Sequence, residues 1–174
     1  FCLLSVGVFG FFISTDLFTM FMFYEIALIP MYLLIGIWGT GKKEYAAMKL
    51  TLMLMGGSAL LLIGILGIYF SAGATTMNIL EIARNHIPES SQRWFFPLTF
   101  IGFGVLGALF PFHTWSPDGH ASAPTAVSML HAGVLMKLGG YGCFRVAIYL
   151  MPEAARELSW IFIILTGISV VYGA

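Results

Sequence analysis

Long runs of apolar residues, separated by short polar stretches, dominate the pattern along this chain. A helix needs roughly 20 predominantly apolar residues to cross the hydrocarbon layer of a bilayer. The pattern therefore predicts an all-α bundle of transmembrane helices, with about four complete spans and a truncated apolar run at each end. The predicted apolar segments are Phe1 to Ile13, Leu17 to Trp38, Ala46 to Phe70, Trp94 to Phe112, Ala126 to Met151 and Leu158 to Ala174.

The chain begins without methionine, and both of its ends lie within apolar runs. We therefore expect residues 1–174 to form one transmembrane domain of a longer polytopic protein, cut within a helix at each end. Ser71 to Arg93 is polar enough to leave the bilayer, with a short interfacial helix from Met77 to His86. The Gly56-Gly57-Ser58 patch predicts a close approach of another helix, because small residues let helix backbones meet.

The composition places the chain in a membrane. Hydrophobic residues make up 59% of it and charged residues 9%, whereas soluble domains carry about a quarter charged residues. The formal net charge is zero and there is no basic run, which argues against nucleic acid as a partner. Cys2 and Cys143 lie in apolar segments without metal-site spacing, so we interpret them as small core residues. We expect an integral, multi-pass protein surrounded by lipid.

Lys137 lies near the middle of the segment from Ala126 to Met151. An ammonium group at that depth costs several kcal/mol or more, and such residues commonly mark ion paths. Desolvation favours the neutral amine, so this side chain could alternate between charged and neutral forms. Tyr141 and Arg145 follow at four-residue steps on the same helix face, which predicts a polar stripe. The alternative is a structural lysine held by a fixed carboxylate.

Glu25 lies about 13 Å, at the helical rise, inside its predicted span. Desolvation favours protonation of a carboxylate at that depth, and a proton relay requires a group that exchanges its proton. The alternative is a permanently protonated side chain bonded to a backbone carbonyl or hydroxyl. Pro30, five residues later, removes a backbone hydrogen bond and could open the helix to water.

Two further basic side chains allow both a structural and a functional interpretation. His131 lies about 120° around the helix from Lys137, on the face of Ser128. It could pass protons between the polar loop and Lys137, or it could be a satisfied structural histidine. Lys49 lies a few residues inside its span and could be an interfacial anchor or a member of the relay.

His113, Asp118 and His120 lie in a polar loop that precedes Pro124. There is no further ligand nearby and no HExxH-type spacing, so we expect no metal here. The loop could be a water-accessible mouth that feeds protons to the bilayer interior, or a plain helix-breaking connection.

Two motifs in this chain resemble those of a known family. They are FYEIALIPMYLLIGIWG over residues 23–39 and PFHTWSPDGHASAPTAVSMLHAGVLMKLGGYG over residues 111–142. Both resemble the antiporter-like membrane subunits of respiratory complex I, in particular the chain called subunit M in bacteria and subunit 4 in mitochondria. The resemblance implies a bundle of about fourteen transmembrane helices, of which the one from Trp94 to Phe112 is interrupted, as transporter helices often are.

The resemblance assigns proton pumping to a glutamate that matches Glu25 and to a central lysine that matches Lys137. The family usually places a lysine seven residues before the histidine that matches His113, where it pairs with that glutamate. Here the position is Leu106, and no charged residue occurs between Trp94 and Phe112. Either another basic residue substitutes or this subunit couples differently. The candidate substitutes are Lys49, Lys137 and His131.

The function implied is a proton-translocating subunit of NADH:quinone oxidoreductase, beside neighbouring antiporter-like subunits in a bacterial plasma membrane or a mitochondrial inner membrane. The chain would hold no cofactor itself, with NADH, flavin, iron–sulfur clusters and quinone bound by other subunits. The alternatives are a subunit of a cation/proton antiporter or of a membrane-bound hydrogenase, or a non-pumping structural spacer. The candidate translocation residues are Glu25, Lys137, His131, His113, His120, Lys49 and Tyr141.

Overall fold

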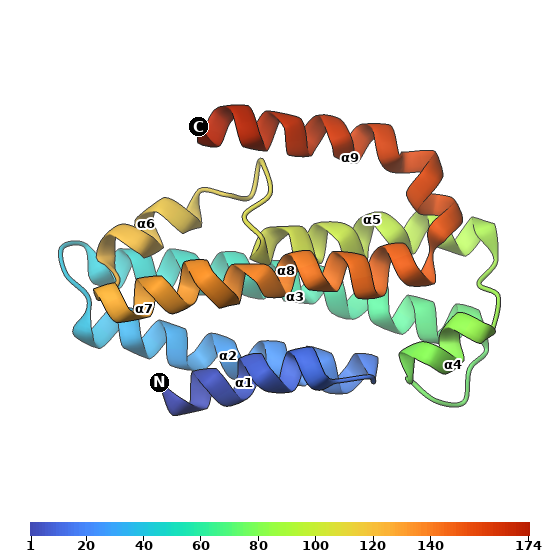
Figure 1. Ribbon diagram of the computed structural model, residues 1–174, viewed down its shortest axis with the longest axis horizontal. Coiled ribbons are helices and arrows are strands. Elements are labelled where there is room, and N and C mark those ends of the chain that lie inside the picture. Colours follow the sequence, from blue (N-terminus) through green and yellow to red (C-terminus); the bar gives the residue numbers. More distant parts are fainter.

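Helices make up the regular structure of the chain, described for residues 1–174 by a computed structural model. The elements are α1 (Cys2–Ile13), α2 (Leu17–Trp38), α3 (Lys43–Ala72), α4 (Ile79–Arg84), α5 (Glu89–Leu106), α6 (Trp115–Ser122), α7 (Thr125–Leu130), η1 (His131–Leu135), α8 (Met136–Gly142), η2 (Cys143–Ile148) and α9 (Pro152–Gly173). Figure 1 shows the long helices running along one common direction, with α4 at one end and α6 at the other. The predicted all-α transmembrane fold class is confirmed.

Most of the predicted spans match helices closely, because long apolar runs have few alternative structures. The second span begins and ends as predicted, at Leu17 and Trp38. Asp16 caps it, since its carboxylate accepts a hydrogen bond from the Thr19 backbone N–H at 3.0 Å. The helix continues through Pro30 without a break.

The most extensive helix packing joins α3 and α5, and glycines make it possible. A Cβ atom added to Gly57 would lie 2.8 Å from the Val105 Cβ, and one added to Gly102 would lie 2.9 Å from the Leu61 Cβ. Both distances are shorter than side chains tolerate, so these positions require glycine. The close approach predicted at the small-residue patch is confirmed at Gly57, whereas Gly56 faces open space.

The helix predicted from Trp94 to Phe112 is interrupted, as expected from the family resemblance. It starts earlier, at Glu89, and ends at Leu106. An irregular stretch follows, and α6 then forms where the sequence predicted a polar loop. That loop prediction is wrong for residues 115–122. Pro117 does not prevent the helix, because it lies in the first turn, where backbone N–H groups have no helical acceptor.

The segment from Thr125 to Leu150 forms one helical rod, but its turns are not uniform. The π-helical segments η1 and η2 flank the regular turns of α8, which carry Lys137. Single π-helical turns within α-helices occur often at functional sites. They also change the angle between successive residues, so face assignments based on regular α-helical spacing fail beyond them.

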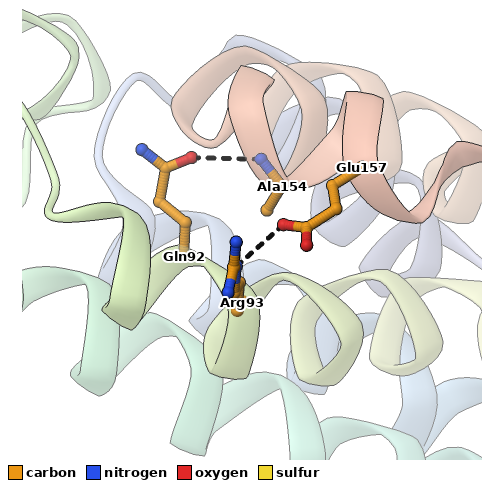
Figure 2. Close-up of polar contacts among 4 residues, drawn as sticks. All are labelled: Gln92, Arg93, Ala154 and Glu157. Atoms are coloured by element: carbon orange, nitrogen blue, oxygen red, sulfur yellow. Dashed lines mark hydrogen bonds and ion pairs between the residues drawn. The ribbon is translucent and has the colours of Figure 1, made fainter.

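The last helix, α9, returns along the outside of the bundle (Figure 1). Its first turns are tied to the start of α5 by side chains, as Figure 2 shows. The buried Gln92 amide oxygen accepts a hydrogen bond from the Ala154 backbone N–H at 3.3 Å. Arg93 pairs with Glu157 at 2.8 Å. These contacts fix the turn that brings α9 back against α5.

Candidate functional site

Glu25 is half-buried on α2, and its carboxylate oxygen Oε1 is buried without a hydrogen-bond partner. The adjacent Tyr24 hydroxyl donates to the Leu54 carbonyl at 3.1 Å rather than to this carboxylate. Glu25 is not part of either ion pair of the structure, which join Lys49 to Asp118 and Arg93 to Glu157. None of the predicted substitute cations therefore forms an ion pair with it.

Leu106, where the resemblance implies a lysine, is the last residue of α5 and only 2% exposed. It packs into the apolar core. The one cation of α5, Arg93, lies near the other end of the helix and pairs with Glu157 (Figure 2). The interrupted helix thus offers Glu25 no partner.

Lys49 of α3 forms an ion pair with Asp118 of α6, with 2.6 Å between Nζ and Oδ2. The ammonium group also lies 5.7 Å from the centre of the Tyr45 ring, within range of a cation–π interaction. Sequence reasoning missed this pairing, because 69 positions separate the two residues. The only available signal was that charged residues are few in this chain.

His120 of α6 lies against the start of the helical rod. Its Nδ1 is 2.8 Å from the Ser128 hydroxyl oxygen, and its ring stacks on His131 with 4.4 Å between centroids. His131 is 0% exposed, and the centre of its ring lies 5.2 Å from that of Trp115. Neither nitrogen of His131 has a hydrogen-bond partner, and unsatisfied buried polar groups of this kind are costly and rare.

We refer to Lys49, Asp118, His120, Ser128 and His131 as the α6 cluster. The short helix α6 brings these side chains from three separate parts of the sequence to one end of the bundle. A pocket of about 420 Å³, open to the outside and lined by Asp118 and Ser122 among others, adjoins the cluster.

Lys137 lies in α8, and its side chain is exposed rather than enclosed. It lines an open, mostly apolar groove of about 550 Å³, together with residues of α5 and with Thr166 of α9. The expectation that Lys137 is buried is wrong for residues 1–174, because these residues leave this face of α8 uncovered. No carboxylate pairs with it, so the structural alternative of a lysine on a fixed carboxylate is not seen.

Tyr141 lines the same groove as Lys137. Its hydroxyl donates to the Phe12 carbonyl at 3.4 Å. Arg145 does not line the groove, its Nε is buried without a partner, and its guanidinium lies 5.5 Å from the centre of the Tyr149 ring. The predicted stripe of three residues is thus reduced to Lys137 and Tyr141, because Arg145 lies in the π-helical turns of η2.

His113 lies in the break between α5 and α6 and faces α9. Its ring stacks on Phe110 at 5.5 Å and meets Tyr172 edge-on at 5.0 Å. Its Nδ1 is buried without a partner, and a cavity of about 150 Å³, also lined by Ser169, adjoins it. Such a volume is large enough for water. The two histidines of this region therefore lie in different surroundings, since His120 faces the helical rod.

The acidic and basic residues of this region do not converge on one point. No three His, Cys, Asp or Glu side chains are placed to share a metal ion. Asp118 and His120 are engaged by Lys49 and Ser128, and His113 faces away toward α9.

Comparison with known proteins identifies the family. Residues 14–174 match the family described as NADH:quinone oxidoreductase/Mrp antiporter, TM. The chain is 40% identical over 164 residues to NAD(P)H-quinone oxidoreductase chain 4-2 of Synechocystis, which covers 94% of this chain and 29% of that protein. It is 40% identical over 166 residues to NADH-quinone oxidoreductase subunit M of Rickettsia prowazekii, with 95% and 34% covered. It thus spans about a third of the length of these relatives.

Solved structures share the fold. A chain of respiratory complex I from Thermus thermophilus gives a TM-score of 0.91 at 27% identity, covering 98% of this chain and 36% of that one. The archaeal membrane-bound sulfane sulfur reductase gives a TM-score of 0.89 at 29% identity. The match covers 98% of this chain and 35% of that one. The Mrp complex from Dietzia sp. gives a TM-score of 0.80 at 25% identity. The match covers 94% of this chain and 31% of that one.

The fold and these matches define an integral membrane protein of the antiporter-like class, and α2, α3 and α9 are long and apolar enough to cross a bilayer. The chain belongs to the NADH:quinone oxidoreductase/Mrp antiporter family. The resemblance to subunit M and chain 4 of complex I, inferred above from two motifs, is confirmed.

Proposed function

We propose that this chain translocates protons as an antiporter-like subunit of an NADH:quinone oxidoreductase, through Glu25, His131 and Lys137. The observation that carries the proposal is that ionisable atoms of Glu25 and His131 are buried in an apolar bundle without any fixed partner. Electron transfer takes place in other subunits of the complex.

The absence of a fixed partner matters because an ion pair locks the charges of both its members. An unpaired buried group instead balances desolvation, which favours its neutral form, against the field of nearby charges. Inside a protein that field is strong, because the effective dielectric constant is low. A charge that arrives or leaves nearby can therefore change the protonation of Glu25 or His131.

The other candidate residues extend the route at both of its sides. His120 is half-buried, and its contact with His131 connects that buried ring to the more accessible end of the bundle. His113 adjoins a cavity with room for water. Lys137 and Tyr141 line the groove on the α9 side. Protons pass between Glu25 and Lys137 through hydrated contacts.

The chain contributes buried ionisable groups and no cofactor of its own. NADH, flavin, iron–sulfur clusters and quinone are bound by other subunits, and neighbouring antiporter-like subunits lie beside this one in a bacterial plasma membrane or a mitochondrial inner membrane. The names of the relatives support this assignment, since they are chains or subunits of quinone oxidoreductases.

The test is Lys137→Ala in the assembled complex, reconstituted in vesicles. We expect a strong reduction or loss of proton pumping, measured per electron transferred, while the complex still assembles. Lys42→Ala is the matched control, because it removes an exposed lysine between α2 and α3. Normal pumping by Lys137→Ala would contradict the proposal.

Two alternatives have specific support. The likeness to the Mrp complex favours a cation/proton antiporter subunit, and sodium dependence of transport without any redox enzyme would identify it. The apolar Leu106, at the position where the family resemblance implies a lysine, favours a structural spacer. Full pumping by the double variant Glu25→Gln with Lys137→Ala would identify the spacer.

A further inference from the structure

Among the contacts that hold the short helix α6 in place, three are distributed along it, one near each end and one in its middle. The Trp115 indole N–H donates to the Val105 carbonyl of α5 at 3.0 Å. The Ser122 carbonyl accepts from the Thr40 backbone N–H at 2.9 Å, in the connection between α2 and α3. The ion pair of Asp118 with Lys49 lies between them. It is the only one of the three contacts that depends on charge.

The position of α6 decides whether His131 has a neighbour that can exchange a proton with it. His120 lies on α6, whereas His131 and Ser128 lie on the helical rod. A displacement of α6 would separate the stacked rings, now 4.4 Å apart, and would break the contact of His120 with Ser128. No other titratable side chain stacks on or bonds to His131.

We infer that Lys49 and Asp118 are a positioning pair, which holds α6 so that His120 stays in contact with His131. Lys49 contributes its permanent charge to this pair and does not itself pass protons. This inference rests on the proposed function and assigns Lys49 one of the two roles that the sequence left open.

The burial of the pair supports a mechanical role. The side chains of Lys49 and Asp118 are 26% and 42% exposed, compared with 61% and 49% for Arg93 and Glu157. The ammonium group also lies 5.7 Å from the centre of the Tyr45 ring. Partial exclusion of water strengthens an ion pair relative to a fully solvated one. Loss of the ion pair between Lys49 and Asp118 should therefore disturb the structure more than loss of the pair between Arg93 and Glu157.

The first measurement is proton pumping by variants of the assembled complex in vesicles. Lys49→Met and Asp118→Asn should each lose most of the pumping. Lys49→Arg keeps the charge but cannot release its proton, so we expect this variant to pump as the wild-type complex does. The exchanged pair, Lys49→Asp with Asp118→Lys, should restore part of it. Glu157→Gln, which breaks the other ion pair, is the control and should pump normally.

The second measurement reports the position of α6 directly and does not depend on pumping. Ser122→Cys places a thiol at a buried position of α6 that lines the open pocket, in a background with Cys2→Ser and Cys143→Ala. Its rate of reaction with a membrane-impermeant maleimide should rise by about tenfold or more on Asp118→Asn, because local opening governs access to buried sites. Lys49→Arg and Glu157→Gln should leave the rate unchanged.

Two results would overturn the inference. If Lys49→Arg pumps as poorly as Lys49→Met while the Ser122→Cys rate stays low, then Lys49 passes protons itself. If Asp118→Asn leaves the Ser122→Cys rate unchanged, the ion pair does not hold α6. Failure of the proposed function is distinguishable, because it would appear as normal pumping by Lys137→Ala, whereas the maleimide rate would still report on the pair.

Discussion

Two regions of this molecule differ in whether their ionisable side chains have partners. Between α3 and α6, Lys49 and Asp118 neutralise one another at 2.6 Å. Within α2 and at the start of the helical rod, Glu25 and His131 have buried polar atoms with no partner at all. A paired charge resists changes in protonation, because losing one partner strands the other. On the proposed function, the first region fixes structure and the second exchanges protons.

The strongest test of this contrast is Glu25→Gln. Glutamine has nearly the same size and cannot ionise, so we expect the complex to assemble and proton pumping per electron to fall severely. Glu44→Gln, which alters an exposed carboxylate in the first turn of α3, should pump normally. Equal pumping by the two variants would remove the functional difference between the buried and the exposed carboxylates.

A second test separates the chemistry of His131 from its packing. His131→Phe keeps an aromatic ring next to Trp115 and His120 but removes both nitrogens. Because unsatisfied buried polar groups cost about 1–3 kcal/mol, we expect the thermal midpoint to stay the same or rise, while pumping decreases. His131→Ala removes the ring as well and should lower the midpoint. Undiminished pumping by His131→Phe would show that the ring serves packing alone.

The smallest expected effect concerns the exposed ion pair in Figure 2. Exposed pairs contribute about 0.2–1 kcal/mol to stability, so Arg93→Gln should shift the thermal midpoint only slightly and leave proton transport unchanged. Gln92→Ala is a useful comparison, since it removes a buried side chain that joins α5 to α9. A large transport defect in Arg93→Gln would place a functional charge outside the regions compared here.

Much of the fold could be predicted from the sequence, because transmembrane helices are long and apolar. The bounds of α2 were predicted without error, and those of α3 to within three residues. The helix α6 was missed because its residues are polar and include a proline. The π-helical turns of η1 and η2 have no composition that distinguishes them from α-helix. They invalidate the regular spacing on which the placement of Arg145 depended.

The candidate site was predicted less completely. Burial arguments selected Glu25 and Lys137, because a lone ionisable residue in an apolar run is visible in the sequence. They left both a structural and a functional interpretation open for His131. The partnership of Lys49 with Asp118 was not visible, since it depends on how α6 folds back against α3. The exposure of Lys137 depends on which helices cover α8, and periodicity within one helix cannot show this.

The central claim, that an unpaired buried carboxylate changes protonation during turnover, can be observed directly in the infrared spectrum. Difference spectra of the complex in vesicles, recorded on addition of NADH, should contain a band from a protonated carboxylic acid group that is absent in Glu25→Gln. We expect this band to appear in the active complex and to persist in Glu44→Gln. A difference spectrum that is identical in the wild-type complex and in Glu25→Gln would show that Glu25 keeps one protonation state, and would contradict the claim.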